Sequence, residues 1–351
     1  MNKKAFFLFT EISGYMLNCF EKSVDNGYDI HAVVYPINND APFKFENSNK
    51  INFYNRSEFS SNIKLIELIS SVNPEIIVVS GWIDKEYLKV AKFFRKSTKT
   101  IIAFDTQWVA SFKQIIFSII GRYFLKKRFK YAWVPGDKQY KYAEKLGFNS
   151  SEIFKYLYTC NTDIFFKNNF DILKAKSKSF PKVFLFVGRY APSKGLNQLC
   201  QSFLQLKKQE PNKWELWCVG TGPSWNNRIL HSSIKHLGFK QPNEFESILC
   251  KTGVYVLPSN FEPWGVSLHE FTCAGYPIIS SDISGASSEL VINGSNGFIY
   301  SNNDNEELKQ VMKKIISLTD LELLNMAKVS VDLSKKFSPD KWVNSLNLMC
   351  K

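Results

Sequence analysis

No apolar run in the sequence approaches the ~18 residues that a membrane-spanning helix needs. The first apolar stretch, Ala5 to Phe9, stops at Thr10 and Glu11, short of the ~7 to 15 residues of a secretory leader. We therefore expect neither a leader nor a membrane span. Any contact with a membrane would be made from its surface.

Cysteine pairs and metal-type spacings are also missing. The seven cysteines are scattered, with no C-x-x-C motif and no short metal-type spacing of the zinc-site kind to a histidine. No D-x-D motif follows a strand-like run, and no motif indicates a cofactor-bearing lysine. We therefore expect reduced thiols, a cytoplasmic protein, no metal site and no cofactor.

The composition that is present favours a two-domain globular protein. At ~150 residues per domain, 351 residues correspond to about two domains. Hydrophobic residues make up 44% of the chain, enough for two cores, and a charged fraction of 22% excludes wholesale disorder.

Short apolar runs alternate with amphipathic stretches in two series, which predicts an α/β protein with two doubly wound parallel sheets. The runs are residues 5–10, 29–35, 74–80, 100–105 and 132–136, and then 183–188, 215–220, 253–258 and 276–282. The expected organisation is an N-terminal domain over 1–166, a Lys- and Ser-rich linker over 167–181, a second domain over 182–335 and a final helix over 336–351. That helix would open at Ser338 and Pro339 and pack back on the first domain.

Positive charge is concentrated in one region. The chain has a net charge of +13, and residues 85–145 hold fifteen Lys and Arg against four acids, a net of +11. Its centre, residues 111–131, interleaves apolar residues with Lys113, Arg122, Lys126, Lys127, Arg128 and Lys130. This pattern is typical of a basic amphipathic helix in an anionic membrane interface, although an ordinary helix with a solvated basic face also fits. No nucleic-acid partner is expected, because no recognised binding module accompanies the charge.

Two glutamates, Glu262 and Glu270, stand eight residues apart in the strongest local motif. Pro263 suits the first turn of a helix, which would leave Glu262 on the preceding loop and Glu270 about two turns inside. The amides of Trp264, Gly265 and Val266 would then face phosphate oxygens at the helix N-terminus. A capped helix with one solvated acid is the alternative.

Two further strand ends carry groups suited to a diphosphate. Arg189 and Lys194 follow the run 183–188, and Gly220 and Gly222 follow the run 215–220. An Arg fork and a Lys point charge can together neutralise two phosphates, although ordinary surface charge is the alternative.

Five motifs in this order give the chain a family resemblance over residues 186–300. They are GRYAPSKG, VGTGP, LGFKQPNEFESIL, LPSNFEPWGVSLHEFTCAGYPII and NGSNGFIY. The chain resembles the C-terminal domain of the family 4, or group 1, retaining glycosyltransferases. The resemblance implies a GT-B fold, in which two Rossmann-like parallel-sheet domains face each other across a cleft. The second domain would hold a nucleotide-sugar donor and the first an acceptor, and the C-terminal helix would return to the first domain.

The resemblance also implies roles for the site residues. Arg189 and Lys194 would bind the donor diphosphate beside Gly220 and Gly222, and Glu270 would bind the ribose. Glu262 and the amides after it would hold the donor sugar and its phosphate, and Phe239 and Lys240 would lie near the nucleobase. A neutralised diphosphate is a good leaving group, so neither a general acid nor a divalent metal is expected.

The first domain resembles the family less closely. Gly14 lies in the loop after the first strand, where relatives often have a glycine pair, and Tyr15 takes the second place. Asp105 ends the run 100–105, where many relatives carry a histidine, and is the candidate base or orienting group for the acceptor, with a turn aspartate as the alternative. Trp82 marks another strand end expected to face the acceptor.

The function expected from these features is retaining transfer of a hexose from a UDP- or GDP-sugar to a glycan, in bacterial capsule, O-antigen or lipopolysaccharide synthesis. The basic region suggests a lipid-linked acceptor and a peripheral position on the cytoplasmic face of the inner membrane. Two alternatives stay open: another activity on the same scaffold, such as a nucleotide-sugar epimerase or a phosphorylase, and a non-catalytic membrane-surface binding protein.

Overall fold

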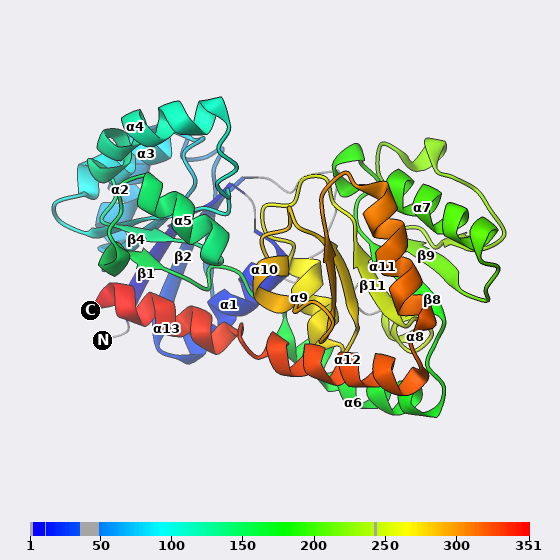
Figure 1. Ribbon diagram of the computed structural model, residues 1–351. Coiled ribbons are helices and arrows are strands. Elements are labelled where there is room, and N and C mark those ends of the chain that lie inside the picture. The colour runs from blue at the N-terminus through cyan, green and yellow to red at the C-terminus, as the bar shows by residue number, and fades with distance from the viewer. Residues whose placement is uncertain (1–2, 11, 36–48, 242–243) are drawn as a thin grey trace. The chain divides into compact units, whose positions relative to one another are not determined.

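Two compact units make up the computed structural model, which describes residues 3–10, 12–35, 49–241 and 244–351 (Figure 1). The first unit joins Met1–Asn161 to Phe337–Lys351, and the second is Thr162–Lys336. Glu11, at the end of the first strand-like run, and Pro242 and Asn243, within the third motif, lie outside the described residues. Every helix in the described ranges is too short or too polar to cross a bilayer.

The first unit is built on a seven-stranded parallel sheet with the order β3-β2-β1-β4-β5-β6-β7. The strands are β1 (Lys3–Leu8), β2 (Tyr28–Val34), β3 (Asn52–Asn55), β4 (Ile76–Ser80), β5 (Lys99–Ala103), β6 (Tyr131–Trp133) and β7 (Ile153–Phe154). One face is covered by α2 (Asn62–Val72), α3 (Lys85–Phe94), α4 (Phe112–Lys126) and α5 (Asp137–Lys145). The other face is covered by α1 (Gly14–Asp25) and α13 (Pro339–Cys350).

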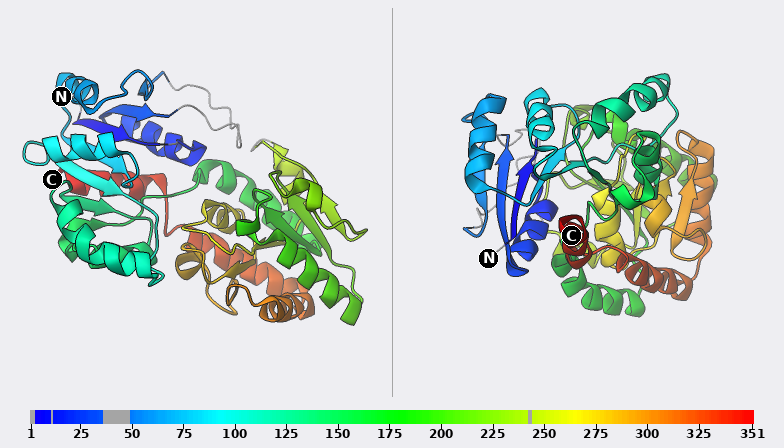
Figure 2. Two further views of the ribbon diagram at one scale, coloured as in Figure 1. Left: turned by 90° about the horizontal axis from the view of Figure 1, so that it is seen from above. Right: turned by 90° about the vertical axis from the view of Figure 1, so that its left-hand side faces the viewer.

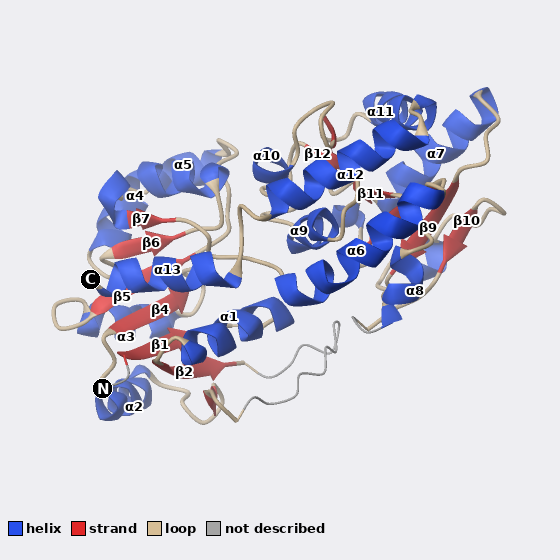
Figure 3. Cartoon of the chain, turned by 90° about the horizontal axis from the view of Figure 1, so that it is seen from below, coloured by secondary structure: helices blue, strands red, loops and turns tan. Residues whose placement is uncertain are grey.

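The second unit is built on a six-stranded parallel sheet with the order β10-β9-β8-β11-β12-β13. Figure 3 labels β9, β10, β11 and β12 of this sheet and the helices around it. The strands are β8 (Val183–Val187), β9 (Glu215–Val219), β10 (Ile234–His236), β11 (Val254–Leu257), β12 (Ile278–Ser281) and β13 (Gly297–Tyr300). The helices are α6 (Thr162–Lys178), α7 (Leu196–Gln209), α8 (Glu246–Leu249), α9 (Val266–Cys273), α10 (Ser287–Leu290), α11 (Asn305–Ser317) and α12 (Asp320–Ser334). The strand order reverses between β8 and β11, which is where doubly wound sheets bind their ligands.

These two parallel sheets confirm the predicted α/β class. The nine predicted strands are present, and the four missed ones, β3, β7, β10 and β13, are the outer strands of the two sheets. Outer strands pair on one side only and can therefore be short and polar, as Asn52–Asn55 is. Hydrophobic runs predict such strands poorly.

The predicted linker over 167–181 is wrong, because most of it belongs to helix α6 of the second unit. The lysines that suggested a flexible segment include Lys176, which is buried. Its Nζ donates hydrogen bonds to the carbonyls of Gly253 (3.2 Å) and Gly275 (2.8 Å) and lies 3.3 Å from the centre of the Tyr276 ring. Because Lys176 bonds to two loop carbonyls, it anchors α6 to the rest of the second unit and does not point into solvent.

Helix α13 returns to the first unit, as predicted (Figures 1 and 2). Ser338 caps it, accepting a hydrogen bond from the Lys341 amide at 3.2 Å, and Pro339 occupies the first turn. The Trp342 ring lies 4.5 Å from that of Trp133, and its indole N–H donates to the Leu157 carbonyl at 2.9 Å. The helix is therefore part of the first unit's core.

Candidate functional site

Loops at the carboxyl edge of the second sheet hold one another in place. The Tyr190 amide, after β8, donates to the Thr221 carbonyl after β9 (2.8 Å), and the Gly220 amide donates to the Gly238 carbonyl after β10 (2.8 Å). The loops after β8 and β11 are joined by the Ser193 carbonyl, which accepts from the amides of Asn260 (2.8 Å) and Phe261 (3.1 Å). The predicted donor residues of four strands therefore lie at one edge.

Lys194 and Glu262 form an ion pair across the point where the strand order reverses. The Lys194 Nζ lies 2.6 Å from Oε2 of Glu262, which also accepts a hydrogen bond from the Ser259 hydroxyl at 3.0 Å. Lys194 ends the short 3-10 helix Pro192–Lys194, whereas Glu262 comes from the loop after β11. Glu262 is buried and Lys194 is half-buried. The ion pair is therefore fixed by hydrogen bonds within the protein, and Lys194 still reaches solvent.

Helix α9 begins at Val266, so the prediction that Pro263 forms its first turn is wrong. Gly265 precedes the helix with φ of +96°, a conformation that a residue with a Cβ adopts at a cost. Residues 263 and 264 therefore stay in the loop, where the Trp264 carbonyl accepts from the Ser284 hydroxyl at 2.8 Å. Within the described residues, the amides of Gly265, Val266 and Ser267 donate no hydrogen bond, and they suit an anion.

Glu270 lies inside α9, as predicted, and is partly buried. Burial raises the pKa of its carboxyl from 4.5 to about 7. Tyr255 of β11 lies near both glutamates: burial raises the pKa of its phenol, and the charges of Glu262 and Glu270 raise it further. The Tyr255 hydroxyl donates to Oγ of Ser267 at 2.8 Å, and the ring stacks on Phe271 at 4.1 Å.

The remaining predicted donor residues border the same edge. Arg189 is exposed directly after β8, and a Cβ on Gly222 would lie 3.0 Å from its Cγ. Gly220 has φ of +129°, and a Cβ there would lie 2.0 Å from the Gly188 carbonyl oxygen, so the β8 and β9 loops meet backbone to backbone. After β10, Phe239 is exposed, and Lys240 pairs with Glu244 at 3.1 Å.

The residues that orient these groups were not predicted from the sequence. Ser259 and Ser284 are buried and bond to Glu262 and to the Trp264 carbonyl. The Ser281 hydroxyl holds the Ser259 carbonyl at 2.6 Å. In the sequence these serines stand at or shortly after the ends of β11 and β12, and only the first of these strand ends was predicted to belong to the site, through Glu262.

In the first unit, Asp105 lies next to Tyr158 after β7. Burial raises the pKa of Tyr158, and the charge and hydrogen bond of Asp105 raise it further. Tyr15 contacts the Tyr158 ring edge-on at 5.5 Å, and Gly14 begins α1. The structure thus brings Tyr15 and Asp105 together around a phenol that the sequence did not single out.

Trp82, predicted to contact an acceptor, packs its ring among aromatic residues of the core. Its neighbours are Phe104 at 5.4 Å, Phe117 of α4 at 5.2 Å and Tyr142 of α5 at 6.3 Å. Its ring therefore packs against α4, α5 and the loop after β5, and its contact with an acceptor stays a prediction.

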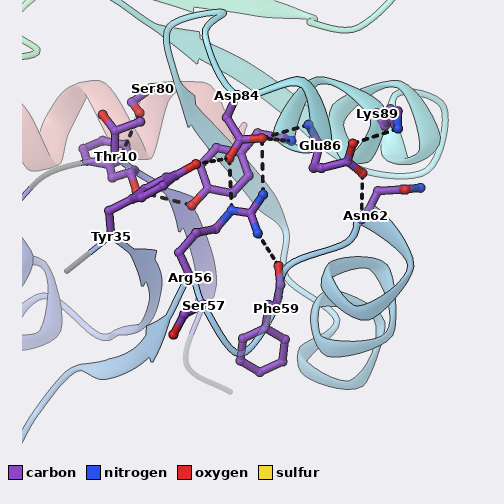
Figure 4. A network of polar contacts seen from close by, with 12 residues as sticks. Thr10, Tyr35, Arg56, Ser57, Phe59, Asn62, Ser80, Asp84, Glu86 and Lys89 are labelled. Atoms are coloured by element: carbon purple, nitrogen blue, oxygen red, sulfur yellow. Dashed lines mark hydrogen bonds and ion pairs between the residues drawn. The ribbon is translucent and has the colours of Figure 1, made fainter.

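A buried ion pair, also missed by the sequence analysis, lies at the carboxyl edge of the first sheet (Figure 4). Nε of Arg56, after β3, lies 3.0 Å from Oδ2 of Asp84, which also accepts from the Tyr35 hydroxyl at 2.8 Å. Oδ1 of Asp84 caps α3 by accepting from the Glu86 and Tyr87 amides. Burial opposes ionisation of Asp84, but these hydrogen bonds prevail and lower its pKa. The network fixes the ends of β2, β3 and β4 relative to α3.

Comparisons with known proteins relate the second unit to a family of enzymes. Residues 168–328 match the family model described as glycosyl transferases group 1. An uncharacterized glycosyltransferase of Methanocaldococcus jannaschii is 27% identical over 232 residues, which cover 64% of this chain and 61% of that protein. The chain thus aligns with less than two thirds of the length of this relative.

Solved structures share the whole fold. Sucrose-phosphate synthase from Thermosynechococcus elongatus superposes with a TM-score of 0.73 at 15% identity, covering 99% of this chain and 98% of that one. Anabaena HepE in complex with UDP superposes with a TM-score of 0.73 at 14% identity, with the same coverages. These similarities show the GT-B fold.

Proposed function

We propose that this chain, whose residues 168–328 form a group 1 glycosyltransferase domain, transfers a sugar from a nucleotide-diphosphate sugar to a glycan with retention of configuration. The observation that carries the proposal is the Lys194–Glu262 pair at the strand-order reversal of the second sheet, beside Arg189 and the amides that precede and begin α9. This edge offers two cations, a helix N-terminus and two carboxylates to one ligand.

Each group has a chemical task in this proposal. Arg189, Lys194 and the Gly265 to Ser267 amides stabilise the charge that develops on the departing diphosphate. When the diphosphate engages Lys194, the Glu262 carboxylate is released to accept hydrogen bonds from sugar hydroxyls. Glu270 accepts from the ribose hydroxyls, and Phe239 and Lys240 lie at the nucleobase.

The acceptor side is proposed for the first unit. Asp105 would accept or orient the acceptor hydroxyl, with Tyr158 and Tyr15 beside it. The basic region supports a lipid-linked glycan acceptor at the cytoplasmic face of the membrane, and hence a role in surface polysaccharide synthesis.

Two cations on the loop after β8 are sufficient in charge to neutralise a diphosphate, so we propose that transfer needs no divalent metal. Activity measured with and without a chelator checks this, and loss of activity in the chelator would contradict it.

The donor assignment is tested by thermal stability of the purified protein with UDP, GDP and their sugar conjugates. A ligand that binds only the folded state stabilises it by about 2.7 kcal/mol at about 100 Kd. We expect one nucleotide series to raise the melting temperature of the wild type and of the control Glu67→Gln, an exposed glutamate on α2. Glu262→Gln and Glu270→Gln should respond weakly. If no nucleotide stabilises the wild type, the proposed donor site is wrong.

A further inference from the structure

Helix α4 presents its apolar residues to solvent. Phe112, Ile115, Ile116, Ile119, Ile120 and Tyr123 are between 43% and 77% exposed. Their spacing of three and four residues places them on one stripe of the helix, about 140° wide at about 100° per residue.

A stripe with this spacing normally faces the core of a domain. In α4 the fully buried residues are instead Gly121 and Leu125, on the opposite side. The helix is held by these two and by Phe117, which contacts Trp82 at 5.2 Å. The six exposed apolar side chains are therefore not required to pack α4 against the first unit.

Basic residues flank the apolar stripe. Residues 106–136 contain six Lys and Arg and no Asp or Glu. Lys113, Arg122 and Lys127 are exposed, whereas Lys126 pairs with Glu152 at 2.5 Å and Arg128 stacks on the Phe124 ring at 3.7 Å. The outer face of α4 is thus apolar at its centre and positive at its two sides, at Lys113 and Arg122, and at its C-terminal end, at Lys127. A helix with a solvated basic face would have no such apolar centre.

The apolar stripe and its positive flanks favour an anionic membrane over a second copy of the chain as the partner of α4. A second copy of the chain would bring the same positive flanks against these, and like charges oppose that contact. An anionic bilayer offers acyl chains to the stripe and phosphates to the flanks. We propose that α4 lies in the interface of an anionic membrane, with its six exposed apolar side chains among the acyl chains and Lys113, Arg122 and Lys127 at the lipid phosphates.

The position of α4 would bring the membrane close to the proposed acceptor side of the first unit. Its first residue, Phe112, follows β5 through the loop that carries Asp105, so the stripe starts at the carboxyl edge of the first sheet. A glycan carried on a lipid of the same membrane would be presented at this edge. The docking itself does not depend on the proposed sugar transfer.

The experiment is co-sedimentation of the full chain with vesicles of phosphatidylcholine alone or mixed with phosphatidylglycerol. The test variant is Ile119→Glu. The control is Leu321→Glu on α12, because Leu321 and Ile119 are 65% and 67% exposed and the change in charge is the same. The Ile119→Trp variant reports insertion through a blue shift of its fluorescence, and free phosphate in place of vesicles tests simple anion binding.

We expect the wild type and Leu321→Glu to bind the anionic vesicles and to bind neutral ones far less. Ile119→Glu should lose about tenfold or more of this affinity, since a burying side chain is replaced by a charge. Lys113→Gln and Arg122→Gln should each lose about fivefold, and salt should weaken the wild type. The proposal is overturned if Ile119→Glu binds anionic vesicles like the wild type, or if vesicles leave the fluorescence of the Ile119→Trp variant unshifted. It is also overturned if free phosphate alone causes the same blue shift, or if the protein forms a dimer through the stripe and does not bind vesicles.

Discussion

At the scale of single residues, Lys194 has two tasks that one substitution would confuse. It neutralises a buried carboxylate in the free protein, and in the proposed complex it binds the diphosphate. Its removal therefore affects both stability and ligand binding, and a second substitution is needed to separate them.

Lys194→Ala should lower the free energy of unfolding by about 1 to 3 kcal/mol, because Glu262 keeps Ser259 as a partner but loses its cation. The double variant Lys194→Ala with Glu262→Gln should regain part of this stability, since no charge is left unpaired. Denaturant unfolding measures both effects. Nucleotide-induced stabilisation should stay lost in the double variant, and its return would remove Lys194 from the donor site.

Glu270 makes stability depend on pH in a direction opposite to most carboxylates. The unfolded chain releases this proton near 4.5, whereas the folded protein holds it until about pH 7. Between these values only the folded state binds the proton, so stability falls as pH rises. The loss should reach about 3 kcal/mol at about 1.4 kcal/mol per pKa unit.

Glu270→Gln lacks this titration, so the free energy of unfolding of the wild type minus that of the variant should decrease between pH 5 and pH 7. Parallel pH curves for the two proteins would show that the folded pKa is not raised. Other carboxylates titrate in both proteins and cancel in the difference.

At the scale of elements, the site depends on how closely the β8 and β11 loops approach. Gly195 has φ of +67°, and a Cβ there would lie 1.9 Å from the Pro258 carbonyl oxygen. Gly294 has φ of +77° with nothing within 4 Å of its Cβ position. The two glycines share a backbone conformation and differ in what surrounds them.

Gly294→Ala should therefore cost about 1 to 2 kcal/mol from backbone strain alone. Gly195→Ala should cost more, because it must also separate two backbones, and it should weaken nucleotide binding by displacing Lys194 from Glu262. Unfolding and nucleotide titration of the two variants check this. Equal losses of stability in the two variants would mean that the loops separate easily.

The element scale also shows what the sequence can predict. Buried central strands were predictable because they are continuous apolar runs, and motifs at their ends predicted which loops meet at the proposed donor site. The outer strands and helix α6 were not, since Asn52–Asn55 is polar and Lys176 reads as solvated until its carbonyl partners are known. The start of α9 depended on the conformation of Gly265, which proline preference alone does not predict.

At the scale of the whole molecule, the first unit is discontinuous in sequence. Residues 162–336 form the second unit, and α13 then completes the first one. Trp342 lies at the centre of this closure, with Trp133, Phe7 and Phe20 around it. The stability of the first unit thus depends on residues beyond the second.

Trp342→Ala should destabilise the first unit by about 3 to 5 kcal/mol, the usual loss for a large buried aromatic side chain. Calorimetry should show that the first unit unfolds at a lower temperature in this variant. The unfolding temperature of the transition that responds to nucleotide should not change. The control is Leu348→Ala, which removes a side chain 45% exposed on the same helix and should change little. A shift of both transitions would mean that the units unfold together.

The return of α13 also bears on how the protein is made. A ribosome completes residues 162–336 before it adds Phe337–Lys351, so the second unit can fold while the α1 side of the first sheet still lacks α13, the second of its two covering helices. Until α13 has been synthesised and has docked, Phe7 and Phe20 form part of an exposed apolar surface, which favours aggregation. A nascent chain arrested before α13 is complete would carry a folded second unit beside an unfinished first unit, and we expect chaperones to bind it.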